Sequence, residues 1–281
     1  MKIAKTIKEV REIVSEWKKL GLSVGLVPTM GYLHDGHQSL IRCSNENDRT
    51  VVSVFVNPIQ FGPNEDFASY PRDLERDTKK CEEAGADLIF APEASEMYAE
   101  DFSSFVDMTG PTDELCGLRR PGHFRGVCTV VSKLFNIVTP DRAYFGQKDA
   151  QQLAVIRRMV RDLSFGIEIV GCPIVREEDG LAKSSRNTYL SADERKAAVV
   201  ISKSLKAGQE MIEKGETDTA KIIASITAMI ESEPLAKIDY IKAVDADSIE
   251  PVDTVSGRIL FAAAVYIGKT RLIDNFIAER N

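Results

Sequence analysis

Hydrophobic residues along the chain change between a helical spacing and an extended one. They recur every three or four positions from Ile3 to Trp17, which predicts an amphipathic helix that ends near Gly21. Similar patterns predict helices at residues 72–84, 126–138 and 150–161, with another beginning near His37. Short apolar runs between them predict buried strands at residues 23–27, 51–56, 87–90, 143–145 and 167–170. Strands that alternate with helices favour a Rossmann-like parallel sheet with helices on both faces.

The pattern changes after Pro173. Helical stretches at residues 193–214 and 218–230 come first there, and strand-like runs at residues 238–244 and 259–267 follow. We therefore expect an α/β domain over residues 1–175 and a smaller α+β domain over residues 176–281. No linker rich in Ser or Gly marks the boundary.

The composition is that of an ordinary globular protein, and 281 residues at roughly 150 per domain fit two domains. With 36 basic and 43 acidic residues the net charge is −7, so no electrostatic basis for nonspecific nucleic-acid binding exists. No apolar run approaches the roughly 20 residues of a membrane span, and the first residues lack the apolar core of a secretion signal. We therefore expect a cytoplasmic chain. Its five cysteines form no CxxC pair, which argues against a disulfide framework or a zinc ribbon.

The segment PTMGYLHDGH, residues 28–37, follows the first buried strand and leads into a helix. In an open parallel sheet, ligands bind beyond the carboxyl ends of the strands, where helix N-termini attract anions. Gly31 and Gly36 allow the backbone to approach such a ligand, and His34 and His37 can donate hydrogen bonds to phosphate oxygens. This segment therefore predicts an anion site.

The chain has only three histidines, and His34, His37 and His123 all lie close to a glycine in predicted loops or loop–helix junctions. Such places are poor for core packing, which favours a functional role. The glycines lack the GxGxxG spacing of a dinucleotide site, and there is no GxxxxGK[ST] phosphate loop. Two alternatives remain open from the residues: a zinc hydrolase that uses the three imidazoles, and a non-catalytic nucleotide-binding regulator.

Two further polar segments suit a phosphate ligand. The segment GQKD, residues 146–149, follows a predicted strand and places Lys148 at the same sheet edge as the histidines. The segment KSSRN, residues 183–187, offers hydroxyls and a guanidinium that can hold several phosphate oxygens. Together with the histidines, they predict that one triphosphate binds all three segments.

These motifs resemble those of the pantothenate synthetase family, ligases that condense pantoate with β-alanine using ATP. From Pro28 to Ser191 the resemblance is carried by PTMGYLHDGHQSLI, SVFVNPIQFGPNEDFASYPRD, RRPGHFRGVCTVVSKLFNIV, YFGQKDAQQLAVIRRMVRDL and REEDGLAKSSRNTYLS. The HxGH element and the Ser-Ser-Arg stretch are also similar to those of the wider nucleotidylyltransferase superfamily. Lys183 departs from the family, whose members carry an apolar residue there.

The resemblance implies that pantoate attacks the α-phosphorus of ATP, giving pantoyl adenylate and pyrophosphate, and that β-alanine then displaces AMP. It implies a homodimer, Mg²⁺ bound with ATP, and a C-terminal domain that acts as a lid over ATP. The implied catalytic residues are His34, His37, Lys148, Ser184, Ser185 and Arg186. The implied ATP contacts are Met30, His37, Gly146, Lys148, Asp149, Val175, Lys183, Ser184, Ser185 and Arg186.

The resemblance also implies a pantoate pocket that pairs amide side chains with an apolar wall. Its implied residues are Pro28, Thr29, Met30, Asn57, Gln60, Gln152 and His123. Gln152 lies one turn after Lys148 and so faces the same direction on a helix. Asp77, in the helix that follows YPRD, is the candidate magnesium ligand.

Overall fold

The computed structural model describes residues 1–63 and 65–280, and these form two compact units. The first, called the sheet unit below, comprises Met1–Met108, Arg120–Gln147 and Val155–Pro173. The second, called the C-terminal unit, comprises Thr109–Arg119, Lys148–Ala154 and the residues from Ile174 onward. Two short segments expected in the first domain, residues 109–119 and 148–154, therefore cluster with the second unit.

The sheet unit is built on a parallel sheet, whose order over the described residues is β1-β4-β3-β2-β5-β6. Its strands are β1 (Lys2–Ala4), β2 (Val24–Thr29), β3 (Arg49–Val54), β4 (Leu88–Phe90), β5 (Arg142–Gly146) and β6 (Glu168–Cys172). Apart from the edge strand β1, the chain moves outward from β2 to β4 and then returns to β5 on the other side of β2. This is the Rossmann order, which confirms the predicted fold class.

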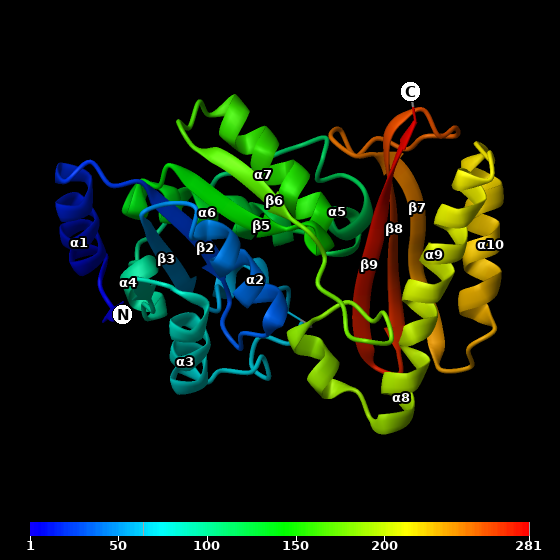
Figure 1. The fold of residues 1–281 in the computed structure, drawn as a ribbon, viewed down its shortest axis with the longest axis horizontal. Helices are drawn as coiled ribbons and strands as arrows, with labels where there is room; N and C mark the ends of the chain where they lie inside the picture. The colour runs from blue at the N-terminus through cyan, green and yellow to red at the C-terminus, as the bar shows by residue number, and fades with distance from the viewer. Residues whose placement is uncertain (64, 281) are drawn as a thin grey trace. The chain divides into compact units, whose positions relative to one another are not determined.

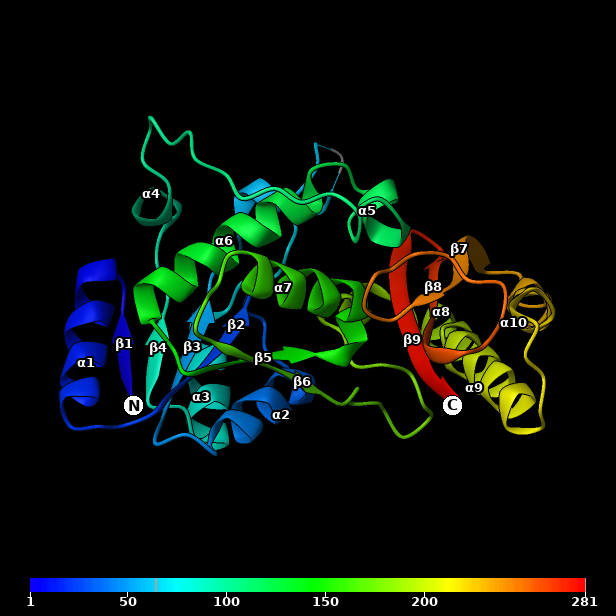
Figure 2. The ribbon, with the colours of Figure 1, turned by 90° about the horizontal axis from the view of Figure 1, so that it is seen from above.

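Helices cover both faces of this sheet. They are α1 (Ile7–Lys19), α2 (Asp35–Ser44), α3 (Leu74–Ala84), the short α4 (Ala94–Met97), α6 (His123–Val138) and α7 (Ala150–Asp162). Figure 2 shows α6 along one face and α2 and α3 along the other. On the α2 and α3 face, Val27, Val52 and Ile89 of the strands are fully buried against Leu33 and Ile41. Burial on both faces explains why the central strands are mostly apolar along their length.

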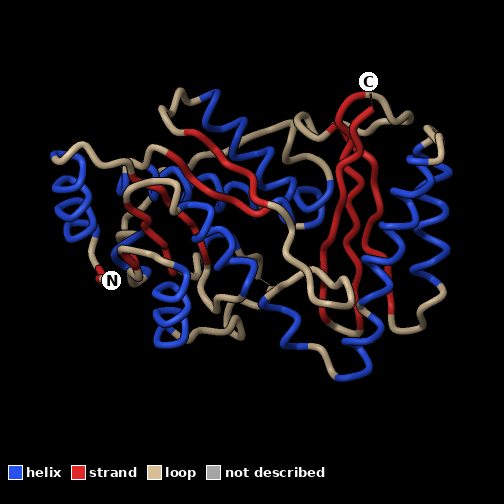
Figure 3. The backbone as a smooth tube through the Cα atoms, viewed as in Figure 1, coloured by secondary structure: helices blue, strands red, loops and turns tan. Residues whose placement is uncertain are grey.

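The C-terminal unit has an antiparallel sheet of β7 (Ala236–Asp245), β8 (Gly257–Ile267) and β9 (Thr270–Arg280) in that order. Its helices are α5 (Leu115–Arg119), α8 (Ala192–Ala197), α9 (Val199–Glu213) and α10 (Thr219–Glu231). The helices α9 and α10 run beside the sheet (Figures 1 and 3) and bury Ile201, Ile222 and Ile226 against Phe261 and its neighbours. The predicted α+β character of this part is confirmed.

Several predicted boundaries were wrong. Ile3 lies in β1 and is 45% exposed, so the first helix begins only at Ile7, after its cap Thr6. The helix predicted at residues 193–214 is two helices, α8 and α9, which meet at Ala198. The strand β9 was not predicted, because charged and polar residues interrupt its apolar pattern. None of the helices in the described ranges has the length and apolar character that a membrane crossing requires.

Candidate active site

The histidine segment lies where the strand order reverses. Strands β2 and β5 pair in parallel through Gly25↔Arg142 and Leu26↔Ala143, so the ends of both, Thr29 and Gly146, lie at the same edge of the sheet. Between β2 and α2 the chain forms a tight loop that we call the histidine loop, residues 30–34. A reversal of strand order next to a helix N-terminus is the usual ligand position in open α/β sheets. The predicted placement of this segment is therefore confirmed.

The histidine loop is held in a strained backbone conformation. Gly31 has φ +81°, and Tyr32 has φ 49°, which non-glycine residues seldom adopt. A Cβ atom added to Gly31 would come within 2.9 Å of Asp77 Oδ2, so glycine is needed for close approach as well as for φ. The Gly31 N–H donates to Thr29 Oγ1 at 3.1 Å. These contacts fix the turn that carries the chain from β2 to the first histidine.

The two histidines cap the N-terminus of α2 reciprocally. The N–H of Gly36 donates to His34 Nδ1 at 3.1 Å, and the N–H of His34 donates to His37 Nδ1 at 3.3 Å. Since each Nδ1 accepts a hydrogen bond, the proton of each neutral ring resides on Nε2. The ring centroids are 4.0 Å apart. Because Nδ1 of each ring accepts a backbone N–H, the donor of each neutral ring is its Nε2–H group. A hydrogen-bond donor is what an anionic ligand requires.

Asp77 of α3 supports the histidine loop. It is 1% exposed, and its carboxylate accepts the N–H of Tyr32 at 2.8 Å and of Leu33 at 2.6 Å. Burial raises the pKa of this carboxyl, while the two backbone N–H groups oppose the shift. Both oxygens are therefore engaged by the protein's own backbone, which favours a positioning role for Asp77 over the predicted coordination of magnesium.

The structure gives no support to a zinc site. Within residues 1–63 and 65–280, no three His, Cys, Asp or Glu side chains gather as a metal ligand set. The Nδ1 atoms of His34 and His37 already accept backbone N–H groups. The donor set therefore does not fit the hydrolase alternative.

Hydrogen bonds connect several of the predicted pantoate residues in the sheet unit. The Asn57 amide donates to Gln60 Oε1 at 2.9 Å, and the Gln60 amide lies 3.1 Å from Met30 Sδ. The Tyr98 hydroxyl donates to Asn57 Oδ1 at 2.7 Å, and burial raises the pKa of this tyrosine. Tyr98 was missed from the sequence, because nothing near it in the chain marks it as polar support. Gln60 ends the short 3-10 helix η1 (Pro58–Gln60) and is buried.

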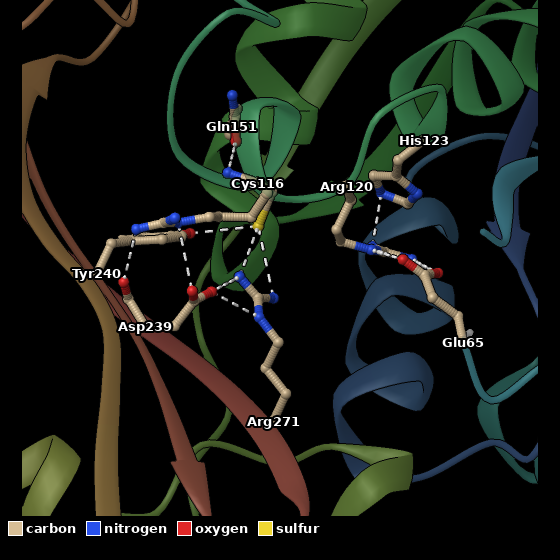
Figure 4. A network of polar contacts seen from close by, with 9 residues as sticks. Glu65, Cys116, Arg120, His123, Gln151, Asp239, Tyr240 and Arg271 are labelled. Atoms are coloured by element: carbon tan, nitrogen blue, oxygen red, sulfur yellow. Dashed lines mark hydrogen bonds and ion pairs between the residues drawn. The ribbon is translucent and has the colours of Figure 1, made fainter. Parts of the chain in front are cut away.

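His123 begins α6 and forms part of a half-buried polar network with Arg120 and Glu65 (Figure 4). Its Nδ1 lies 3.0 Å from the carbonyl oxygen of Gln60, and its Nε2 lies 2.9 Å from Arg120 Nη1. Arg120 in turn makes two hydrogen bonds to the Glu65 carboxylate, of 2.7 and 2.6 Å. His123 therefore lies beside Gln60, another residue of the predicted pocket. It contacts the backbone carbonyl of Gln60 and not its side chain.

The remaining predicted residues lie in the C-terminal unit, apart from Pro28 in β2 and Gly146 at the end of β5. Lys148 and Asp149 form the turn before α7, and Gln152 lies in its first turn. The Asn275 amide of β9 holds the carbonyl of Lys148 at 2.8 Å. The backbone around Lys148 is thus fixed by the C-terminal sheet.

The Ser-Ser-Arg segment forms the 3-10 helix η3 (Ser185–Tyr189). Ser184 caps it by accepting the N–H of Arg186 at 3.3 Å, and Ser185 is buried. Lys183, the residue that departs from the family pattern, pairs with Glu177 at 2.8 Å. This ion pair gives Lys183 a partner within the C-terminal unit.

The chain before this segment forms a small hairpin that is tied to β9. Arg176 pairs with Ala182 in an antiparallel bridge, and its guanidinium makes two hydrogen bonds, of 2.6 and 2.9 Å, to Asp274. Asp274 is 4% exposed. A bidentate pair on a buried carboxylate orients the hairpin more strictly than a single contact does.

A second polar cluster lies in the C-terminal unit around Cys116 of α5 (Figure 4). The Cys116 sulfur contacts the Tyr240 hydroxyl at 3.2 Å and the Arg271 guanidinium at 3.7 and 3.8 Å. Arg271 also binds the Asp239 carboxylate at 2.9 and 3.0 Å. Burial raises the pKa of Tyr240. Nothing in the spacing of the cysteines marks this network, so it was missed from the sequence.

Comparison with known proteins agrees with the motifs. A model of the pantoate-β-alanine ligase family matches residues 2–277. The pantothenate synthetase of Ruminiclostridium cellulolyticum is 63% identical over 276 residues, which is 98% of this chain and 98% of that protein. The pantothenate synthetase of Enterococcus faecalis is 62% identical over 280 residues, 99% of each chain.

Solved structures show the same fold. The crystal structure of pantothenate synthetase from Thermus thermophilus superposes with a TM-score of 0.94 at 46% identity, over 98% of this chain and 99% of that one. The pantoate-β-alanine ligase of Francisella tularensis, complexed with β,γ-ATP and β-alanine, has a TM-score of 0.80 at 35% identity, over 99% and 97%. The chain therefore belongs to the pantoate-β-alanine ligase family and is an enzyme that forms a C–N bond.

Proposed function

We propose that this enzyme condenses pantoate with β-alanine through a pantoyl adenylate, with release of pyrophosphate and AMP. The observation that carries the proposal is the reciprocal capping of α2, which makes Nε2 of both His34 and His37 hydrogen-bond donors. The relative from Francisella tularensis was solved in complex with β,γ-ATP and β-alanine, which supports ATP and β-alanine as two of the substrates. The shared family supports pantoate as the third.

In the first half-reaction an oxygen of the pantoate carboxylate attacks the α-phosphorus of ATP, and the bond to the bridging oxygen of pyrophosphate breaks. Both reactants are anions, so positive charge and hydrogen-bond donors must surround the phosphorus. We assign the Nε2–H groups of His34 and His37 and the N-terminus of α2 to the phosphates. We assign Lys148, Ser184, Ser185 and Arg186 to the same triphosphate, on the strength of the resemblance and their chemistry.

The other assigned ATP contacts are Met30, Gly146, Asp149, Val175 and Lys183, and the C-terminal unit is assigned the role of a lid. Pantoate is assigned to Pro28, Thr29, Met30, Asn57, Gln60 and Gln152. The hydrogen bonds that connect Asn57, Gln60 and Met30 support one shared pocket for these three side chains of the sheet unit.

In the second half-reaction the β-alanine nitrogen attacks the acyl carbon, and AMP leaves with the electron pair of the broken C–O bond. Only the neutral amine is nucleophilic, and a primary amine with a pKa of about 10 is neutral in roughly one molecule per thousand near pH 7. Orientation beside an activated ester provides most of the acceleration. The amine proton goes to a histidine or to solvent.

Magnesium enters with ATP as part of the nucleotide substrate, bound by phosphate oxygens and water. The buried, doubly hydrogen-bonded carboxylate of Asp77 does not fit a metal ligand, so no step is assigned to a metal held by the protein. Following the family resemblance, we propose that the enzyme is a homodimer. We also assign it to the cytoplasm. Light scattering on the purified protein tests the dimer.

Pyrophosphate exchange tests the proposed intermediate. With ATP, Mg²⁺ and pantoate alone, the enzyme should exchange labelled pyrophosphate into ATP, and addition of β-alanine should then release AMP. AMP formation that requires β-alanine but shows no exchange without it contradicts the stepwise route. Production of ADP and phosphate contradicts the adenylate itself.

A further inference from the structure

Both ring nitrogens of His123 have partners whose hydrogen-bonding roles are fixed. The carbonyl oxygen of Gln60 can only accept, so the Nδ1 atom that lies 3.0 Å away must carry a proton. The Arg120 guanidinium can only donate, so the Nε2 atom that lies 2.9 Å from it must present a lone pair. His123 is therefore an uncharged Nδ1–H imidazole. Its tautomer is opposite to that of neutral His34 and His37, whose Nδ1 atoms accept.

Arg120 is itself fixed by Glu65. The two short hydrogen bonds between them form a bidentate ion pair in which the Arg120 and Glu65 side chains are 18% and 23% exposed. This pair holds Arg120 Nη1 as a donor toward His123 Nε2. A second proton on His123 would face that donor, so the pair selects the uncharged ring.

The Gln60 backbone is held on another side by α6. A Cβ atom at Gly126 would lie 2.4 Å from the Ile59 oxygen and 2.5 Å from Gln60 Cα, so the helix touches the backbone of η1 directly. The Asn57 amide nitrogen bridges Gln60 Oε1 at 2.9 Å and the Gly126 carbonyl at 3.2 Å. The first two turns of α6 thus hold the main chain of Gln60 through His123 and its side chain through Asn57.

We propose that His123 is a positioning residue, which acts on pantoate only through Gln60, and that the Glu65–Arg120 pair serves to fix its tautomer. This inference rests on the proposed function, because it takes Gln60 as a pantoate contact. It replaces the direct contact between His123 and pantoate that the sequence predicted, since both polar atoms of the ring are used within the protein.

A double-mutant cycle tests this route. His123→Phe keeps an aromatic ring and removes both hydrogen bonds, and we expect the KM for pantoate to rise about tenfold while the KM for ATP stays unchanged. His123→Asn can still donate to the Gln60 carbonyl and should recover most of the loss. In a Gln60→Ala background, His123→Phe should have little further effect on the KM for pantoate. Additive effects of the two substitutions would show a direct contact and overturn the proposal.

Nitrogen-15 NMR of the histidine rings tests the tautomer without any substrate. The wild-type signal of His123, assigned by its loss in His123→Asn, should be that of a neutral ring protonated at Nδ1 across neutral pH. Arg120→Met removes the donor opposite Nε2 and leaves the Gln60 carbonyl in place, so Nδ1 should stay protonated while Nε2 becomes free to bind a second proton as the pH falls. A wild-type ring protonated at Nε2, or at both nitrogens, contradicts the proposal.

The two measurements separate the possible failures. A wild-type enzyme that makes no AMP from ATP, pantoate and β-alanine overturns the proposed function, and the NMR spectrum then still tests the hydrogen-bond pattern. An active enzyme with additive substitutions overturns only the role of His123.

Discussion

Asp77 and Leu33, which are 44 positions apart in the chain, are joined by a hydrogen bond of 2.6 Å from the Leu33 N–H to the Asp77 carboxylate. The other carboxylate oxygen accepts the N–H of Tyr32 at 2.8 Å, in the residue with φ 49°. One buried side chain of α3 thus stabilises the strained turn that precedes His34.

Asp77→Asn should reduce the rate of adenylate formation more than it reduces the affinity for pantoate. An amide has a single oxygen, so one of the two backbone N–H groups would face an NH₂ group, at a cost of about 1–3 kcal/mol. The histidine loop should then relax and displace both imidazoles. Pre-steady-state release of pyrophosphate measures the step.

Glu82→Gln is the matched control, because Glu82 is an exposed residue of the same helix. A normal rate of pyrophosphate release in Asp77→Asn would remove Asp77 from the support of the loop. A rate restored only by raised magnesium would favour the metal role that the sequence predicted.

Substitutions of His34 should separate capping from chemistry. Asparagine is among the best N-cap residues, whereas alanine forms no cap, so His34→Ala should lose about 1 kcal/mol of stability and His34→Asn little. Both should lose about 100-fold in adenylate formation, because neither places a donor where the Nε2–H lies. Urea unfolding and pyrophosphate release measure the two effects. An active His34→Asn enzyme would restrict His34 to capping.

The stability of the sheet unit should depend on pH through Glu65. Burial raises the pKa of Glu65, but the hydrogen bonds and charge of Arg120 outweigh it, so the pKa lies below the usual 4.5. A carboxyl whose pKa is lowered by folding stabilises the protein above its unfolded pKa, and this contribution is lost as the pH falls through the folded pKa.

Glu65→Gln should therefore destabilise the protein by about 1 kcal/mol at pH 7, after allowance for solvent screening. The difference from wild type should shrink below about pH 4.5, where both pKa values are approached. Urea unfolding at a series of pH values measures it. A difference that stays constant down to pH 3 would mean that Glu65 carries no folding-linked proton.

Arg176→Lys should weaken ATP use. Lysine keeps the charge but cannot make two parallel hydrogen bonds to the buried Asp274, so the hairpin before the Ser-Ser-Arg segment should lose its fixed orientation. We expect the KM for ATP to rise about tenfold. Arg258→Lys, at an exposed pair with Glu279, should leave it unchanged. Equal effects of both substitutions would show a general loss of stability instead.

Local patterns predicted the fold and the place of the histidine loop between a strand and a helix, but they did not predict the contacts that support this loop. The strands β2, β3 and β5 are mostly apolar, and a helix follows each of them in the chain, so the pattern of apolar residues was enough to find them. Asp77 could not be singled out as buried, because its partners Tyr32 and Leu33 lie on another element.

The same reason explains the other errors. The state of His123 depends on Glu65, which is brought to it by a turn more than 50 residues upstream in the chain. Ile3 fits a helical stripe by spacing, yet its pairing with Ile89 of β4 places it in a strand. Hydrogen bonds between residues far apart in the chain determine the state of His123 and the strand position of Ile3. The spacing of residues in the sequence does not reveal these bonds.

Transfer of an oxygen isotope tests the central claim most directly. Pantoate labelled with ¹⁸O in its carboxylate is turned over with ATP, Mg²⁺ and β-alanine, and the products are analysed by mass spectrometry. Attack of the carboxylate on the α-phosphorus predicts one ¹⁸O atom in the phosphate of each AMP and none in pyrophosphate. Unlabelled AMP, or label in inorganic phosphate, would contradict the adenylate mechanism.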